Sequence, residues 1–428
     1  MAHLGAKSKL SASISPPSAI PKTLVAILPK LTHKRNYQTN LNLMKTIFLT
    51  IAILTFSTFT FAQENIYKPF YLNIEVDSVT QNRIFSNLDS LFSQISEGQI
   101  ADSLLNNHNQ EYNKAIFNMF RNLGVDNNNN NDFYKKQIIN FYPISKNEYW
   151  ISIAYIGKHE TEPPILRSIV SLIANLENDN VNFSIPLYYL TKNWKKKEIG
   201  KITYYYTDSI NENRAKHFEK KNIEIAEKLG VKPEKFDFYM TKNYQDVSKL
   251  LGHDFDARRN GTTNLGMGAS YNMIFAIMNN EDFSHDILHF YTSRLRNGIQ
   301  MNFTAEEGIG YVWGNAYYVN SESEMISQKQ LVAQLQDYLK RNPKTSVLKL
   351  FNENTQIFTN IPKIVSSKST ISGVICDYIE KKKGIEGIKQ LILCGAGDEN
   401  FFKKIDELVG INESNFDKKV SELIKNYK

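Results

Sequence analysis

Apolar residues recur at two spacings in the first part of the chain. Over residues 84–95 and 112–123 they stand three or four positions apart, which is the spacing of one face of an α-helix. Later runs are rich in β-branched and aromatic residues and are divided by polar turns, which is typical of strands. These strand candidates cover residues 149–157, 165–176 and 183–191, with a fourth over 198–206.

From residue 202 onward the pattern alternates between strand and helix and then becomes almost wholly helical. It predicts strands over residues 202–207 and 236–240, and helices over 213–229 and 244–251. Residues 252–270 are rich in glycine and polar residues, which favours an irregular segment or an edge strand. A β-capable run over 271–278 precedes helices that continue to Lys428, with breaks at 342–343, 362 and 395–397.

These elements predict two domains of the α+β class. Residues 63–201 place helices on an antiparallel sheet, which resembles the NTF2-like and cystatin-like domains. That resemblance is one of topology and implies no function. Residues 202–428 predict a mixed sheet followed by a helical subdomain.

The net charge of the chain comes from one end. The formal charge is +7, but residues 1–62 hold seven Lys or Arg and no Asp or Glu, so the remainder has 44 basic and 44 acidic residues. Because residues 63–428 have a formal net charge of zero, there is no electrostatic reason to expect nucleic acid as a partner. A hydrophobic content of 42% over 428 residues is enough for a folded core and argues against a disordered chain.

Residues 44–62, which begin at Met44, have the layout of a secretory signal peptide. Lys45 supplies the positive charge, residues 47–61 are apolar, and small residues lie at the end of the segment. We expect cleavage after Ala62 and a secreted or periplasmic protein. The apolar run is shorter than the roughly 20 residues of a membrane span, so none is expected after cleavage. Residues 1–43 are interpreted as an upstream extension from a misassigned start codon.

Two of the six histidines that follow residue 62 stand four positions apart, namely His285 and His289. On a helix this spacing puts both imidazoles on one face, about 5–6 Å apart, so that both can bind one metal ion. A second helix is predicted to begin near Thr304 and to contain Glu307. Helices joined by a short turn pack antiparallel, which returns Glu307 toward the histidines. Three such ligands leave a fourth position open for water, as in catalytic zinc sites.

This pairing resembles the gluzincin metallopeptidases, and within them the exported peptidase MA-like group. In that family an HExxH helix supplies two zinc ligands and the general base, and a Glu before a Gly in the next helix supplies the third ligand. His285, Asp286 and His289 stand at the HExxH positions, and Glu307 stands before the glycine of the second motif. The resemblance covers residues 202–428. It implies a gluzincin-like domain, a Zn²⁺ cofactor and a peptide or protein substrate.

The base position departs from the family's pattern, because the motif here is HDxxH. Asp286 has the charge of the family's Glu, but its side chain is shorter by one C–C bond, about 1.5 Å. Misplacing a catalytic group by about 1 Å can cost roughly a hundredfold in rate. Asp286 is therefore either the base, placed by an adjusted backbone, or an exposed acid that suits the first turn of a helix.

Glu307 also has a second interpretation. Residues 304–307 form a capping-box pattern, in which the last Glu bonds back to the helix start, and Glu306 would then be the substitute ligand. The carboxylate that the family often places four residues after the third ligand falls at Tyr311, so support of that kind is missing or comes from elsewhere.

Other side chains are weaker candidates for chemistry. A tyrosine hydroxyl after the third ligand would stabilise an oxyanion, although most of the 23 tyrosines serve packing. These tyrosines are Tyr311, Tyr317 and Tyr318. His253 either faces the cleft or makes a local structural bond. Cys376 and Cys394 either form one disulfide or stay as buried free thiols.

The sequence thus predicts an exported, monomeric, zinc-dependent metallopeptidase-like protein that hydrolyses peptide bonds with zinc-activated water. His285, His289 and Glu307 hold the metal, while Asp286 and Tyr311 are the catalytic candidates. The alternative is a weak or inactive peptidase homologue that acts as a zinc-binding or partner-binding module.

Overall fold

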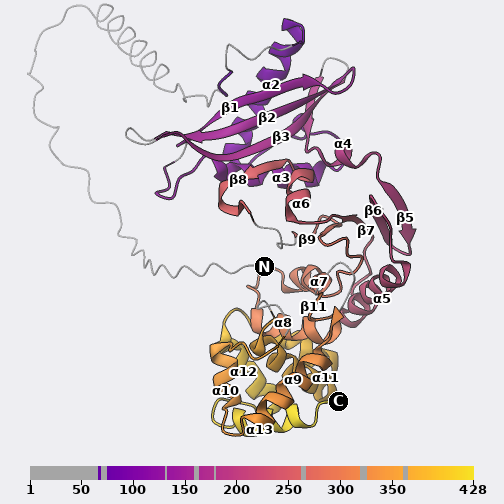
Figure 1. The fold of residues 1–428 in the computed structure, drawn as a ribbon, viewed down its shortest axis with the longest axis vertical. Coiled ribbons are helices and arrows are strands. Elements are labelled where there is room, and N and C mark those ends of the chain that lie inside the picture. Colours follow the sequence, from indigo (N-terminus) through magenta and orange to yellow (C-terminus); the bar gives the residue numbers. More distant parts are fainter. Residues whose placement is uncertain are drawn as a thin grey trace, which may run out of the picture. The chain divides into compact units, whose positions relative to one another are not determined.

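The computed structural model describes most of the chain after residue 65. The described residues are 66–68, 75–130, 133–158, 163–177, 180–261, 267–318, 325–359 and 365–428. They belong to one compact unit, Ile66–Lys428 (Figure 1). The signal peptide expected over 44–62 and the extension over 1–43 lie outside them. No helix in these ranges combines the length and the apolar character that a membrane span requires.

The first sheet is antiparallel and carries two helices on one face. Ile151 and Leu172 from its strands share a buried core with Leu88 and Phe117 from the helices. The strand order is β1 (Tyr134–Pro143), β2 (Glu148–Gly157), β3 (Ile165–Glu177) and β4 (Asn180–Ser184), with β8 (His253–Asp256) also paired to β3. The helical segments are α2 (Ser78–Glu97), η1 (Asp102–Leu104), α3 (Gln110–Met119) and η2 (Phe120–Leu123).

Two expectations for this region need correction. Strand β1 was not predicted, because its polar residues hide the apolar alternation of an edge strand. The strand expected over 183–191 ends at Ser184, and Leu187–Thr191 is the short helix α4, which follows Pro186. Proline fixes its backbone angle near the helical value, which favours a helix directly after it. The apolar residues 187–191 therefore form a helical turn and do not continue the strand.

The second sheet is mixed. Its order is β5 (Lys195–Ile199), β6 (Ile202–Tyr206), β7 (Phe236–Met240), β10 (Met273–Ala276) and β9 (Met267–Ser270). The three central strands are parallel, and both edge strands are antiparallel to their neighbours. Helix α5 (Glu212–Leu229) makes the crossover between β6 and β7, and its Phe218 packs on Phe238 with ring centroids 5.5 Å apart.

The remainder is helical, apart from the small pair β11 (Tyr317–Tyr318) and β12 (Met325–Ile326). The breaks expected at 342–343 and 395–397 are confirmed, whereas residue 362 lies outside the described ranges. The helices are α6 (Tyr244–Leu250), η3 (Ala257–Arg259), α7 (Asp286–Arg296), α8 (Phe303–Trp313), α9 (Gln328–Arg341), α10 (Val347–Glu353), α11 (Ser367–Ile392), α12 (Asp398–Val409) and α13 (Phe416–Lys425). Cys376 and Cys394 are both free thiols here.

The two sheets share a core. Tyr205, Tyr239 and Phe275 stack across the second sheet, with successive centroids 4.7 and 5.1 Å apart, and Phe275 then stacks on Tyr112 of α3 at 5.9 Å. The boundary expected between 201 and 202 falls at the turn of the β5–β6 hairpin, and β8 from the later part completes the first sheet. The chain is therefore mixed α and β, with an antiparallel sheet, a mixed sheet and a C-terminal helical region.

We expect the whole of this unit to unfold in one transition. Replacing Phe275, which is 1% exposed, by alanine should lower the free energy of unfolding by about 3–5 kcal/mol, because it leaves a cavity in the stack. Tyr271→Ala at the exposed end of the stack should cost about 0.5 kcal/mol or less. Urea unfolding followed by both circular dichroism and tryptophan fluorescence measures this. Two separate transitions, only one of them shifted, would contradict a shared core.

Candidate metal centre

His285 and His289 lie one helical turn apart at the start of α7. The helix begins at Asp286, and His285 stands just before it with helical backbone angles, φ −70° and ψ −54°. The ring centroids of the two histidines are 5.3 Å apart, with 66° between the ring planes. The backbone therefore presents both imidazoles on the same side, as the spacing predicts.

Glu307 reaches these histidines from α8. Its Oε2 lies 3.4 Å from Nε2 of His285, and its Oε1 lies 3.4 Å from Nε2 of His289. The capping-box interpretation of Glu307 is wrong, because α8 begins earlier than expected. Asn302 is the N-cap, and its side chain accepts a hydrogen bond from the backbone of Ala305. Glu307 is thus free of the helix terminus.

The three side chains fit a divalent metal ion. Their candidate ligand atoms all lie within 4.8 Å of one another. Ligand atoms about 2.0–2.1 Å from a tetrahedral zinc ion are roughly 3.3 Å apart, close to the two 3.4 Å separations found here. Two imidazoles and a carboxylate suit zinc and other first-row metals, so the donor set alone does not single out zinc.

Each histidine is also held through its second ring nitrogen. Nδ1 of His285 lies 2.9 Å from the carbonyl oxygen of Asn315, and Nδ1 of His289 lies 3.3 Å from Oε2 of Glu306. Both partners are acceptors, so each Nδ1–H donates and each Nε2 is left to face Glu307. Metal-binding histidines commonly have this arrangement, because the outer bond fixes the tautomer and the ring orientation.

Glu306 is the supporting carboxylate that the sequence did not locate. It is fully buried, and it pairs with Arg296 at 3.1 Å and accepts a hydrogen bond of 2.5 Å from the hydroxyl of Thr292. Its predicted role as a substitute ligand is not what the geometry shows, since it lies on the Nδ1 side of His289 rather than beside Glu307. Consecutive helical residues point about 100° apart, which places the two glutamates on different sides of one imidazole.

The charges within the cluster reinforce one another. Burial alone would lower the pKa of His289, but the carboxylates of Glu306 and Glu307 outweigh it and raise that pKa to about 10. Burial likewise opposes the charged form of His285, yet its hydrogen bond to Glu307 raises its pKa. Burial raises the pKa of Glu307, but its contacts with the two histidines outweigh burial and hold that pKa well below the usual range. The carboxylates thus favour positive charge on the histidines, at the place that a cation would take.

Asp286 lies beside the cluster without being tied to it. It is half-buried at the first turn of α7, and its negative charge helps to raise the pKa of both histidines. Among the described residues its carboxylate has no hydrogen-bond partner. A carboxylate that is near the cluster yet uncommitted is available to exchange a proton with a bound molecule.

The other candidates are not part of the cluster. The ring of Tyr311 lies 5.7 Å from that of His285, but its hydroxyl accepts a hydrogen bond of 3.4 Å from the backbone of Ser366. This placement favours packing over an oxyanion role. Tyr317 and Tyr318 form β11, and their side chains lie outside what the structure describes. His253 lies on β8 in the first sheet, where burial lowers its pKa to about 4.

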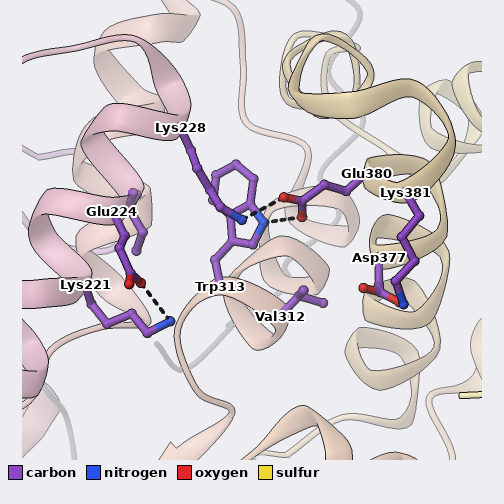
Figure 2. Close-up of a pocket in the computed structure, with 9 residues that line it drawn as sticks. Lys221, Glu224, Lys228, Val312, Trp313, Asp377, Glu380 and Lys381 are labelled. Atoms are coloured by element: carbon purple, nitrogen blue, oxygen red, sulfur yellow. Dashed lines mark hydrogen bonds and ion pairs between the residues drawn. The ribbon is translucent and has the colours of Figure 1, made fainter. Parts of the chain in front are cut away.

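A groove of about 450 Å³ lies on another side of α8, away from the histidines (Figure 2). Every charged residue that lines it is paired with another one. The pairs are Lys221 with Glu224, Lys228 with Glu380, and Lys381 with Asp377. Trp313 also donates to Glu380 at 2.6 Å. The groove therefore offers no uncompensated charge to a ligand, and its contacts serve to join α5, α8 and α11.

Gly310 sets how closely α8 approaches His285, which gives a first test of the site. A Cβ at this position would lie 2.8 Å from Cε1 of His285, too close for the ring to keep its place. We expect Gly310→Ala to weaken zinc affinity about 10- to 100-fold, as displaced ligands usually do. Competition with a coloured chelator measures this.

Gly124→Ala is the matched control, because the nearest atom to its new Cβ is 3.9 Å away. Equal zinc affinity in the two variants would show that the position of His285 does not matter for binding.

Comparison with known proteins adds no family to this geometry. No protein-family model matches the chain, and no curated protein matches it. What the site does must therefore be argued from its own residues.

Proposed function

We propose that this protein is an exported, zinc-dependent metallopeptidase-like hydrolase that cleaves peptide bonds with an activated water molecule. The observation that supports this most strongly is that His285, His289 and Glu307 converge on one point. The Nδ1 atom of each histidine has its own hydrogen-bond acceptor, and the carboxylate of Asp286 lies beside the cluster without a hydrogen bond to it. A structural metal site has four protein ligands, whereas three leave room for water. Export rests on the sequence of residues 44–62 alone.

The chemistry divides between the metal and the chain. A zinc ion held by His285, His289 and Glu307 would lower the pKa of a water molecule and polarise a substrate carbonyl. The carboxylate of Asp286 would accept a proton from the attacking water molecule and would then donate it to the leaving amine. Glu306 and Asn315 keep the two imidazoles in the tautomer that leaves Nε2 free.

A peptide substrate fits the sheet next to the site. Strand β9 is the last strand of the second sheet, and it lies against α7. A strand at a sheet edge has backbone groups free to pair with an extended chain, which is a common way to hold a peptide. We therefore take a peptide or protein as the substrate. The finer fold assignments, gluzincin-like for residues 202–428 and NTF2- or cystatin-like for 63–201, belong to the same proposal.

A second candidate function is a zinc-binding or partner-binding module with little or no turnover. The observation that favours it is Asp286, whose side chain is about 1.5 Å shorter than the glutamate of an HExxH motif. In that case the ligands and their outer contacts would stay intact while proton transfer is slow.

The metal site predicts one bound ion per chain. After zinc loading and removal of excess metal, we expect about one zinc per wild-type chain and almost none in His289→Ala or Glu307→Gln, since each removes a ligand. Elemental analysis by mass spectrometry measures this. His108→Ala, at an exposed histidine just before α3, is the control and should keep its metal. A wild-type value near zero would refute the site.

The role of Asp286 can be separated from metal binding. Asp286→Asn should keep the zinc and lower kcat for a labelled protein substrate by about 10²–10⁴, because the amide cannot accept the proton. If wild type is inert and Asp286→Glu gains activity, the second candidate function is correct instead. Activity that is unchanged in Asp286→Asn would exclude this residue as the base.

A further inference from the structure

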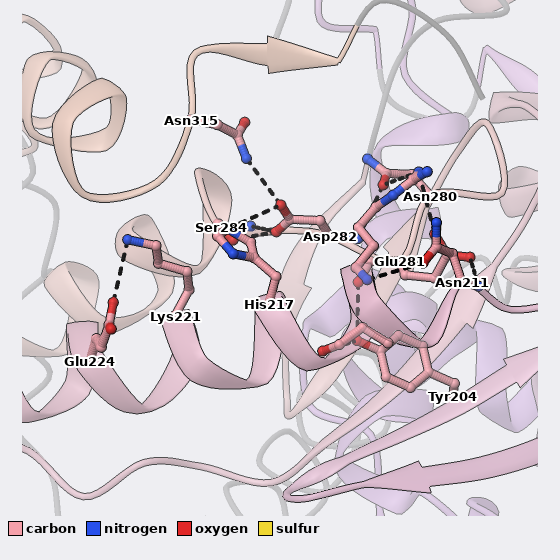
Figure 3. A network of polar contacts seen from close by, with 12 residues as sticks. Tyr204, Asn211, His217, Lys221, Glu224, Asn280, Glu281, Asp282, Ser284 and Asn315 are labelled. Carbon is pink, nitrogen blue, oxygen red and sulfur yellow. Dashed lines mark hydrogen bonds and ion pairs between the residues drawn. The ribbon is translucent and has the colours of Figure 1, made fainter. Parts of the chain in front are cut away.

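Asp282 is a charged residue with no access to solvent, and it lies just before α7 (Figure 3). Its Oδ1 accepts hydrogen bonds from the backbone of Ser284, at 2.8 Å, and from the Ser284 hydroxyl. Its Oδ2 accepts a hydrogen bond of 3.2 Å from the side-chain amide of Asn315, and Nε2 of His217 lies 3.9 Å away. A buried carboxylate is costly unless it is bonded in this way, so its presence calls for a physical reason.

Asn315 connects this carboxylate to the metal centre. It follows the end of α8, it is only 3% exposed, and its two polar groups point in different directions. The side-chain amide donates to Asp282, while the main-chain carbonyl accepts from Nδ1 of His285 at 2.9 Å. One residue thus links Asp282 to the outer nitrogen of a candidate ligand.

We propose that Asp282 and Asn315 are positioning residues for His285: Asp282 fixes the side chain of Asn315, and the carbonyl of Asn315 then fixes the ring of His285. This inference rests on the proposed metal site and extends it. It gives His285 the support that Glu306 gives His289 directly, but through a backbone carbonyl instead of a carboxylate.

The backbone around Asn315 explains why such an anchor is needed. The preceding residue, Gly314, has φ −98° and ψ −116°, outside the helical region, so α8 ends there. A Cβ on Gly314 would lie 2.6 Å from the carbonyl oxygen of Ser284, which shows how tightly this turn packs against the start of α7. The peptide plane of this carbonyl is held on one side by the backbone N–H of Ala316, which donates to the carbonyl oxygen of Ile326 at 2.9 Å. The bond from the Asn315 side chain to Asp282 holds the same residue on the other side, against the start of α7.

The network also joins the two ends of the site. Asp282 precedes α7, and Asn315 follows α8, so their bond ties together the segments that carry His285 and Glu307. A carboxylate that only stabilised its own loop would need no more than the two hydrogen bonds that it accepts from Ser284. The further hydrogen bond, from the side chain of Asn315, is the one that reaches a candidate metal ligand.

The two arms of Asp282 can be cut separately. Asn315→Ala removes the arm toward His285, and Ser284→Ala removes the hydroxyl bond on the other oxygen, so each deletes one side-chain hydrogen bond to the same buried carboxylate. We expect Asn315→Ala to weaken Co²⁺ and Zn²⁺ binding about tenfold or more, and Ser284→Ala to change it less than about threefold. Chelator competition on the purified full chain measures affinity, and urea unfolding of the metal-free protein measures stability.

The visible spectrum of bound Co²⁺ supplies a readout that general destabilisation does not move. We expect altered band positions in Asn315→Ala and the wild-type spectrum in Ser284→Ala, because only the former loosens the residue whose carbonyl holds the ring of His285. If both variants lose affinity in proportion to their loss of stability and both keep the wild-type spectrum, the network is structural and the proposal is overturned.

An exchange of the two side chains gives a rescue test. Asp282→Asn alone leaves only a neutral amide–amide bond, for which the side chain of Asn315 must turn over, and we expect it to weaken binding about threefold or more. Combined with Asn315→Asp, the amide at 282 donates to the new carboxylate, and Ser284 keeps its acceptor, so affinity should recover at least threefold. No recovery would overturn the positioning role. Failure of wild type to bind Co²⁺ or Zn²⁺ would instead refute the metal site itself, together with this inference.

Discussion

The close packing of α8 between α7 and α11 is the constraint on which the candidate site depends. Two glycines make it possible, since a Cβ on Gly308 would lie 2.4 Å from the hydroxyl of Ser372, and one on Gly310 would lie 2.8 Å from the ring of His285. With these helices in contact, Glu307 comes within 3.4 Å of both histidines. Larger side chains would hold the helices apart and leave the carboxylate out of reach.

The helical period then distributes the polar groups around the histidines. Adjacent residues on α8 point about 100° apart, so Glu307 faces the Nε2 atoms while Glu306 faces the Nδ1 atom of His289. Glu306 has no access to solvent, and its carboxylate lies 3.1 Å from Nε of Arg296. The side of each imidazole that would hold a metal and the side that fixes its orientation are therefore set by one short stretch of backbone.

The sequence predicts the three candidate ligands better than it predicts the residues that orient them. The i and i+4 histidines and the strand at 236–240 depend on local periodicity, which is visible without a structure. The start of α8 was misplaced because Asn302, a good N-cap, lies outside the expected helix. The contact of Asn315 with His285 spans 30 residues and uses a main-chain carbonyl, a group that every residue has, so no residue type marks it in advance.

The buried polar groups bear on what the site is for. Replacing a buried ion pair by apolar side chains is often neutral or stabilising. The pair of Glu306 with Arg296, and the contacts of Asp282 with Ser284 and Asn315, are therefore not explained by stability alone. Both carboxylates act on the Nδ1 side of a histidine, one directly and one through Asn315. Hydrogen bonds to Nδ1 fix the orientation and the tautomer of both imidazoles. Apolar side chains at these positions would leave the tautomer of each ring unfixed. Such orientation would serve an active hydrolase and a binding module alike, and the carboxylate of Asp286 at the first turn of α7 is the feature that favours the proposed hydrolase.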